Sequence, residues 1–278
     1  MTHIACLAHR ALISIAGPDW AAFLKGLCTA DIDAVVSDST KGQLHSLHYG
    51  AFLRPQGKMI CDCILQAVSA DEIWLDVPLS ERDELLAKLN MYKLRAKVTI
   101  TPLDRPVFVA FGGDLPAGFS LDPRSEIIGD TIGFAYTAQS ENTLLDEWLD
   151  FRFRLGLSDP GYDFAKDELY PIDANLDLLN AIDFHKGCFI GQELTSRMKR
   201  RGQIKNRILP LRQDGQLNRG AEILSGERKI GEVLISSQKA ALGLMRLDRL
   251  EGGIATSGGT DITVDTPVWM AKYVLTSV

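Results

Sequence analysis

Alternating apolar and polar positions in the first 111 residues predict short β-strands separated by turns. Two such runs, 43–53 and 58–68, flank a turn-forming Pro-Gln-Gly at 55–57 and therefore predict a β-hairpin. Apolar residues at helical spacing follow Asp19 and Ser80, where we expect helices to begin. Because strands alternate with helices and include a hairpin, the pattern predicts an α+β fold. Further strands are expected at 11–16, 73–77, 97–101 and 107–111.

The pattern changes in the second half of the chain. Between 144 and 155, apolar residues return mainly at intervals of three and four, which predicts an amphipathic helix, and a short helix is expected at 175–182. From 204 onward, five or six short β-rich runs separated by glycine and aspartate turns predict a small barrel or sandwich. We therefore expect an α+β domain over 1–204 and a C-terminal β-barrel domain over 205–278.

Composition narrows the class of protein but not its function. The 278 residues include 30 Lys+Arg and 36 Asp+Glu, which gives a net charge of −6, and 46% of the residues are hydrophobic. No run of about 18 apolar residues is present, so we expect no membrane-spanning helix and no membrane partner. Nothing at the N-terminus resembles an export signal. These features are typical of a cytoplasmic globular protein, and the acidic total argues against direct nucleic-acid binding.

The charge is unevenly distributed along the chain. The stretch 141–185 contains eleven acidic and three basic residues, whereas 186–207 contains seven basic residues and one acidic residue. A cationic segment in an anionic protein can receive an anionic ligand or partner. It can equally be a solvated loop whose charges pair with the acidic stretch beside it, and spacing alone does not decide between the two.

Five cysteines, an odd number, argue against a disulfide framework and indicate reduced thiols. Cys61 and Cys63 share a face if their segment is a strand. Neither a second cysteine pair nor a nearby histidine completes a zinc-like ligand set, so burial of the pair is favoured and no metal site is predicted. The other cysteines are Cys6, Cys28 and Cys188.

The most informative chemistry surrounds Cys188. Lys186 lies two residues before it, and Gly187 and Gly191 allow a ligand to approach the backbone closely. A nearby lysine and a helix that begins after Gly191 both favour the thiolate form of a cysteine. Gln192 and Glu193 add an amide and an acid in the first helical turn. These residues suit a polar ligand pocket or a reactive thiol, although an inert buried cysteine is also compatible with them.

The segment Lys-Gly-Cys-Phe-Ile-Gly-Gln-Glu at 186–193 resembles the K-G-C-[YF]-x-G-Q-E signature of the YgfZ-type folate-binding proteins, relatives of the glycine-cleavage T-protein, an aminomethyltransferase. Asn-Leu-Asp at 175–177 and Thr-Ser-Arg at 195–197 are similar to the mitochondrial iron–sulfur assembly branch of that family. Weaker similarities extend along the chain, at 23–31, at the turn and strand 54–63, at 92–97, and at Arg152 and Arg154.

The resemblance implies a T-protein-like folate-binding domain followed by a small β-barrel. It implies tetrahydrofolate or a one-carbon folate derivative as the ligand, bound in a central cavity. Cys188 would carry the assembly function, and Asp62 stands where the T-protein has its catalytic aspartate, although Cys61 replaces the aspartate before it. A hairpin aspartate satisfied by backbone N–H groups is the alternative for Asp62. The folate-binding residues would be Lys186, Gly187, Gln192, Glu193 and Arg197.

Three functional hypotheses follow from the resemblance. The first is a folate-binding accessory factor for iron–sulfur client or scaffold proteins, with weak turnover or none. Cys188 alone cannot hold a cluster, because clusters usually need four protein ligands. The second is a folate-dependent aminomethyltransferase that uses Asp62; the Lys-Gly-Cys signature and the missing first aspartate count against it. The third is a tRNA-modification factor that binds RNA through 197–207, against which the acidic total argues.

Overall fold

An antiparallel five-stranded sheet forms the centre of the N-terminal part. The computed structural model describes residues 1–201, 204–250 and 254–275. The strand order of this sheet is β3-β4-β5-β2-β6, with each strand hydrogen-bonded to its neighbours in the order. Its strands are β2 (Arg10–Ala16), β3 (Leu47–Leu53), β4 (Met59–Ser69), β5 (Glu72–Pro78) and β6 (Thr99–Leu103).

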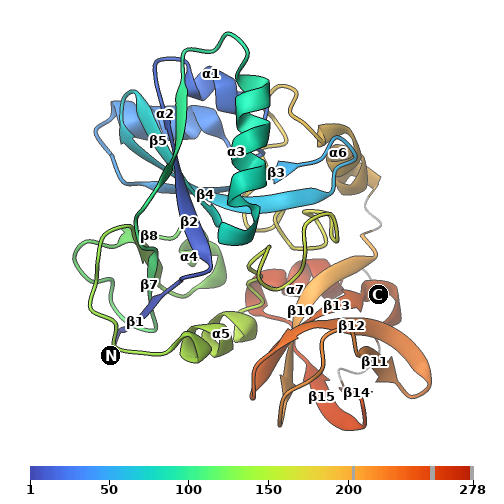
Figure 1. The fold of residues 1–278 in the computed structure, drawn as a ribbon. Helices are drawn as coiled ribbons and strands as arrows, with labels where there is room; N and C mark the ends of the chain where they lie inside the picture. Colours follow the sequence, from blue (N-terminus) through green and yellow to red (C-terminus); the bar gives the residue numbers. More distant parts are fainter. Residues whose placement is uncertain (202–203, 251–253, 276–278) are drawn as a thin grey trace.

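The two faces of this sheet have different environments because successive side chains of a strand point to opposite sides. Cys61 and Cys63 on β4 face a core shared with the helices α1 (Trp20–Lys25), α2 (Ile32–Thr40) and α3 (Leu79–Lys93). Figure 1 labels β2, β3, β4 and β5 of this sheet, with α1, α2 and α3 beside them. Ile64 joins a second core on the opposite face, and Asp62 alternates with the two cysteines. The hairpin β3–β4 therefore separates a helix-covered face from an inner face.

A four-stranded antiparallel sheet closes the inner face. Its order is β1-β7-β9-β8, and its residues pack into the same core as those of the inner face. Two helices belong to this part, α4 (Ser125–Ile128) and α5 (Leu145–Arg154). The strands are β1 (His3–Cys6), β7 (Phe108–Phe111), β8 (Ser120–Leu121) and β9 (Ile132–Ala135).

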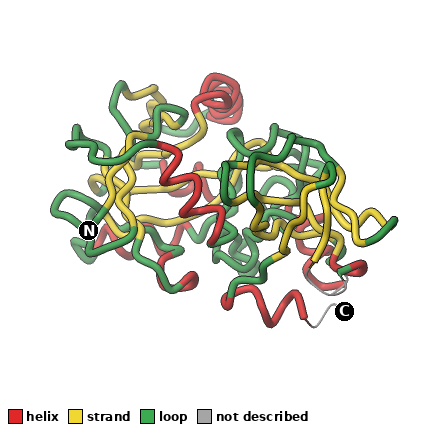
Figure 2. The backbone as a smooth tube through the Cα atoms, turned by 90° about the horizontal axis from the view of Figure 1, so that it is seen from below, coloured by secondary structure: helices red, strands yellow, loops and turns green. Residues whose placement is uncertain are grey.

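The C-terminal part is a closed barrel in the order β10-β13-β12-β11-β14-β15. Figure 2 shows the strands in two groups, one on the side of the N-terminus and the other, the barrel, near the C-terminus. α6 (Gln192–Arg201) precedes the barrel, and the 3₁₀ turn Leu247–Arg249 and α7 (Val268–Leu275) follow strand β13 and strand β15. The barrel strands are β10 (Asn206–Gln213), β11 (Glu222–Ser225), β12 (Arg228–Ser236), β13 (Ala240–Arg246), β14 (Ile254–Ser257) and β15 (Thr260–Val264).

A buried ion pair fastens the barrel to the loops before α6. The Arg207 guanidinium on β10 donates to both carboxylate oxygens of Asp177, at 2.9 and 3.1 Å, and also to Asn175. Lys199 on α6 donates to the same Asp177 at 2.9 Å. Two bases of the cationic stretch are thus paired with one acid of the acidic stretch, as the second alternative expected, but they lie on a helix and a strand and the Arg207–Asp177 pair is buried rather than solvated.

The expected α+β architecture, the hairpin and the barrel are present, and the differences are local. The helix predicted at 175–182 is wrong: the segment forms turns, with φ of 63° at Asn175 and 55° at Asn180. The first helix begins directly after Asp19 as predicted, but the Asp19 side chain makes no capping hydrogen bond and accepts one from the Lys97 backbone instead. The start predicted at Ser80 is wrong, because α3 begins one residue earlier, at Leu79. Strand β3 begins at Leu47 rather than at 43. The pattern did not predict β1, β8, β9, β14, α2, α4 or α7.

Two further expectations concern cysteines and membranes. All five cysteines are free thiols, and Cys61 and Cys63 are fully buried on one face of β4. Within the described residues, no helix is both long enough and apolar enough to cross a bilayer.

Candidate functional site

The motif cysteine, Cys188, is exposed in the loop that precedes α6. It lines a groove of about 850 Å³ between this loop, the tip of the β3–β4 hairpin and the C-terminal end of α3. The walls combine three aromatic rings with charged and amide groups. The lining residues are Pro55, Tyr92, Phe184, Cys188, Phe189, Ile190, Gly191, Gln192, Glu193, Ser196, Lys199 and Arg200.

Glycines allow the hairpin tip to pack against the start of α6. Gly191 has a φ of +84°, and a Cβ there would lie 2.8 Å from the Arg54 carbonyl oxygen and from the Leu53 Cβ. Gly57, in the hairpin turn, has a φ of +77° and would bring a Cβ to 3.2 Å from Leu194. Both positions disfavour any side chain. The turn predicted at 55–57 and the motif glycine thus meet at one side of the groove.

Lys186 anchors the loop that carries the signature, residues 186–191 (the motif loop), to the segment after α1. Its ammonium donates to the carbonyl oxygens of Cys28, at 2.5 Å, and Ala30, at 2.7 Å, and lies 5.1 Å from the centre of the Phe189 ring. Burial lowers the pKa of this amine, although the neighbouring Cys28 and Asp183 oppose the change. The ammonium is therefore engaged by backbone carbonyls beneath the loop.

The loop before α6 packs against the segment 26–30. The Ile190 N–H donates to the Gly26 carbonyl, and the Asp183 N–H donates to the Thr29 carbonyl. The fully buried Thr29 hydroxyl donates to the Ala181 carbonyl at 2.7 Å. This segment belongs to the weak similarity at 23–31, so those residues have a structural use as the support of the motif loop.

The structure gathers only part of the predicted folate-binding set at the groove. Gln192 and Glu193 line it, whereas Arg197 is exposed on α6 and is not among the lining residues. Gly187 is exposed beside Cys188, and a Cβ there would meet no atom within 4 Å. Sequence reasoning missed Tyr92, Phe184, Lys199 and Arg200 as parts of one groove. These residues are up to 108 positions apart in the chain, so no local sequence pattern indicates that they share a groove. Tyr92 does begin one of the weak family similarities, at 92–97.

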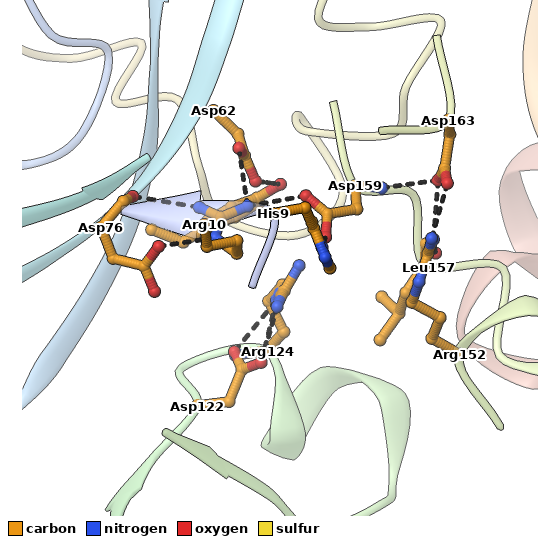
Figure 3. A network of polar contacts seen from close by, with 11 residues as sticks. His9, Arg10, Asp62, Asp76, Asp122, Arg124, Arg152, Leu157, Asp159 and Asp163 are labelled. Carbon is orange, nitrogen blue, oxygen red and sulfur yellow. Dashed lines mark hydrogen bonds and ion pairs between the residues drawn. The ribbon is translucent and has the colours of Figure 1, made fainter. Parts of the chain in front are cut away.

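Asp62 lies elsewhere, on the inner face of the five-stranded sheet (Figure 3). One of its carboxylate oxygens accepts from Arg10 at 3.2 Å, and the other accepts from the Tyr49 hydroxyl at 3.2 Å. Arg10, on β2, also donates to Asp76 at 2.6 Å and to Asp159 at 2.7 Å. One buried guanidinium thus holds three carboxylates, and side-chain partners rather than backbone N–H groups satisfy Asp62.

The carboxylates around Arg10 have opposite electrostatic character. Burial raises the pKa of Asp62 to about 6, although Arg10 opposes this change. Burial also acts on Asp159, but Arg10 and the hydrogen bond from His9 outweigh it and hold the pKa of Asp159 well below its usual range. Asp159 therefore stays ionised beside Arg10, whereas Asp62 accepts a proton more readily than Asp159.

Little space remains beside Asp62. The cavity lined by Arg10, Asp62, Arg124, Arg152 and Asp159, among others, is about 10 Å³, which is room for about one water molecule. Arg124 lies 4.5 Å from the centre of the Tyr49 ring and pairs with Asp122, and Arg152 pairs with Asp163. The predicted catalytic residues, Asp62 and Cys188, thus line separate spaces. Among the described residues, no cluster of His, Cys, Asp or Glu is arranged to hold a metal ion.

Comparisons with known proteins define the class. Residues 205–272 match the family model of the CAF17 C-terminal beta-barrel domain. The crystal structure of the glycine cleavage system aminomethyltransferase T from Bartonella henselae superposes with a TM-score of 0.75 at 17% identity, over 96% of this chain and 86% of that one. The fold is therefore that of the T-protein with a C-terminal six-stranded barrel, which confirms the predicted fold class.

The relatives by sequence are more specific. The chain is 30% identical to the mitochondrial iron-sulfur cluster assembly factor IBA57 homolog of Mycosarcoma maydis, over 75% of this chain and 56% of the relative. The protein of the same name from Coccidioides immitis is 25% identical, over 97% of this chain and 83% of the relative. The chain spans about half the length of the first of these relatives. Its homologues are iron–sulfur cluster assembly factors of the IBA57 type; membership of the YgfZ branch stays a prediction.

The predicted cytoplasmic location needs correction. The relatives from Mycosarcoma maydis, Pyricularia oryzae and Coccidioides immitis are all named as mitochondrial proteins, which contradicts it. Composition and charge could not have revealed this, because they describe a globular protein without describing its compartment.

The same substitution at two carboxylates of Arg10 should have opposite effects on the pH dependence of stability. The pKa of Asp62 is higher in the folded chain, about 6, than the value of about 3.9 expected when unfolded. Its contribution to stability is therefore fully present below about pH 4 and is lost as the pH rises through 6. Asp62→Asn should flatten the decline of stability between pH 4 and 7, as followed by urea denaturation at each pH.

Asp159 supplies the matched control. Because its pKa is lower in the folded chain, its contribution is present at neutral pH and is lost as the pH falls below about 4. Asp159→Asn should therefore cost about 2 kcal/mol or more at pH 7 and progressively less in acid. Equal losses for both variants at pH 7 would contradict the assignment of different roles to the two carboxylates.

Proposed function

We propose that this chain is an accessory factor in the assembly of iron–sulfur proteins and that it acts through Cys188 in the groove. The observation that carries the proposal is the position of this thiol. Cys188 is the one exposed cysteine of the five, and it lines a groove whose 850 Å³ falls in the range of small-ligand sites. The names of the homologues supply the process, and the groove supplies a place where a thiolate can meet a partner.

The chemistry open to Cys188 is that of a single exposed thiol. Its thiolate can provide one ligand to an iron–sulfur cluster, accept sulfur or form a mixed disulfide. Clusters usually need four protein ligands, so a cluster held here would take its remaining ligands from a client or scaffold protein. The walls of the groove, with the rings of Tyr92 and Phe184 and the charge of Arg200, would then be part of the contact with that partner.

The tetrahydrofolate that the resemblance implies does not fit beside Asp62. The remaining space of about 10 Å³ is far smaller than a pterin ring, and both oxygens of the carboxylate are engaged by Arg10 and Tyr49. The groove is large enough. There, Tyr92 and Phe184 offer aromatic faces to a planar ring, and Arg200 offers a guanidinium to the glutamate carboxylates. We propose that any folate of this protein is bound in the groove.

The geometry disfavours aminomethyltransferase activity of the T-protein type. That reaction would use Asp62 for proton transfer at a bound folate, but the Asp62 side chain is 2% exposed and bound to Arg10. A proton carrier has to reach its substrate directly or through one water. For RNA binding, two of the bases of 197–207, Lys199 and Arg207, are already paired with Asp177, which weakens the case for an RNA surface here. Residues 202 and 203 lie outside the described residues.

A cellular test addresses the role of the thiol. In cells that lack the chain, Cys188→Ser should fail to restore the activity of iron–sulfur enzymes, because a hydroxyl is a poor cluster ligand and no sulfur carrier. Cys6→Ser, a change at a partly buried cysteine of β1, should restore it fully. Protein levels of the two variants must match. Normal enzyme activity with Cys188→Ser would remove the thiol from the mechanism.

A binding test locates the folate. Titration of the purified chain with tetrahydrofolate, followed by calorimetry, should show binding that Tyr92→Ala weakens about fivefold or more, because one stacked ring is worth about 1–3 kcal/mol. Asp62→Asn should leave the affinity unchanged. A loss of affinity in Asp62→Asn, with Tyr92→Ala unaffected, would place the folate in the inner cavity and contradict the proposal.

A further inference from the structure

Two buried thiols lie beneath the motif loop. The Sγ atoms of Cys28 and Cys63 are 3.7 Å apart, and both side chains are fully buried. Cys28 follows α1, and Cys63 lies on β4 directly opposite Gly50 of β3. A disulfide requires the sulfur atoms to approach to about 2.0 Å. The pair is therefore within less than 2 Å of bonding distance without a change in strand register.

The backbone of β3 leaves space for the Cys28 sulfur at Gly50. A Cβ at Gly50 would lie 3.0 Å from this sulfur and 2.8 Å from Ala30, so glycine leaves the space that the thiol occupies. Cys28 also forms a β-bridge with Phe52, two residues along β3 from Gly50. Both cysteines are thus held against the same strand, and their sulfur atoms meet above Gly50.

The electrostatic setting makes the two thiols unequal. Burial acts to raise the pKa of Cys28, but the hydrogen bond with Cys63 and the positive charge of Lys186 outweigh it and lower that pKa. Burial and the proximity of Cys28 raise the pKa of Cys63. Cys28 is therefore the better nucleophile of the pair. Lys186, which supplies the charge, belongs to the motif and donates to the Cys28 carbonyl.

A small cavity adjoins the groove and is lined by neighbours of Cys28, although not by either thiol. It measures about 10 Å³, enough for one water-sized molecule, and is lined by Leu27 and Phe52, which adjoin Cys28 in sequence or across the bridge. Tyr92 and Ile190 line both this cavity and the groove. A small movement of these two side chains would admit an oxidant of the size of water, such as hydrogen peroxide, to the neighbourhood of Cys28.

We propose that Cys28 and Cys63 form a redox-active pair that hydrogen peroxide converts into a disulfide. The Cys28 thiolate attacks one peroxide oxygen, the O–O bond breaks, and the departing hydroxide takes up a proton to leave as water while Cys28 becomes a sulfenic acid. The Cys63 sulfur then attacks the Cys28 sulfur; the S–O bond breaks, and the hydroxyl leaves with the Cys63 proton as a second water. Two electrons pass from the thiols to the peroxide, and a dithiol reductant reverses the change.

Formation of the disulfide would affect the motif loop through the segment 26–30, which contains Cys28 and contacts that loop. The Cys28 carbonyl accepts from Lys186, and the Gly26 carbonyl accepts from the Ile190 N–H two residues after Cys188. A shift of Cys28 toward Cys63 alters the acceptor of Lys186. This pair is separate from the exposed thiol of the proposed function, and the test can be made without that thiol.

The test uses the full chain with Cys188→Ser, folded and treated with hydrogen peroxide. After excess peroxide is removed, the chain is denatured, alkylated and digested with trypsin. We expect the loss of two alkylatable thiols, a mass lower by two hydrogen atoms, and a cross-link between the peptides of Cys28 and Cys63. A dithiol reductant should restore both thiols. If both cysteines remain alkylatable in the folded, peroxide-treated chain, the proposal is overturned.

Cys61 provides the matched control, because it is as buried as Cys63 and lies on the same face of β4. Since Cys61 and Cys63 share one tryptic peptide, the variant Cys61→Ala decides which of them is linked: the cross-link should persist there and should be absent in Cys63→Ala. A cross-link that survives Cys63→Ala would contradict the pairing. Circular dichroism before oxidation shows whether each variant is folded; should Cys63→Ala fail to fold, Cys61→Ala alone settles the assignment.

Discussion

The structure depends on one buried guanidinium, that of Arg10. Arg10 on β2 binds Asp62 on β4, Asp76 on β5 and Asp159 in the loop after α5, and thereby joins three strands of one sheet to a segment 149 residues away. Removing one partner of a buried charge typically costs several kcal/mol of stability. The guanidinium therefore keeps its three carboxylates together. The same guanidinium fills the space in front of Asp62 and leaves room for about one water molecule. An arrangement that stabilises the inner face thus also closes it.

Because the space beside Asp62 is nearly filled, the reactive group that a ligand or partner can reach is Cys188, on the surface of the molecule. The motif loop lies on the segment 26–30, held by Lys186 beneath it, and presents Cys188 to a groove formed with α3 and the hairpin tip. The sheet places the aspartate and the cysteines of β4 on opposite faces. Asp62 points to the inner face, whereas its neighbours Cys61 and Cys63 point toward the helices and the segment 26–30. A T-protein fold can in this way carry an exposed thiol on its surface while the space beside Asp62 is nearly filled.

Local chemistry made part of this structure predictable. Pro-Gln-Gly specified the hairpin turn, and glycine-punctuated runs specified the barrel, because turn residues act over a few positions. Cys188 could be singled out from its glycines and lysine. The Arg10 network could not, since no spacing links Arg10 to Asp159. The helix expected at 175–182 failed for a related reason: the Asn175 side chain donates to the Ile208 carbonyl of the barrel and accepts from Arg207, and these long-range contacts override the local pattern.

The central claim is that Asp62 serves the fold whereas the groove serves the function. The most direct measurement is the activity of iron–sulfur enzymes in cells whose only copy of this chain carries Asp62→Asn, at a protein level matched to wild type. Asparagine keeps an acceptor for Arg10 and Tyr49 but cannot transfer a proton as a carboxylate does. We predict activity indistinguishable from wild type. Loss of enzyme activity with a folded, normally abundant Asp62→Asn protein would contradict it and return the chemistry to the inner face.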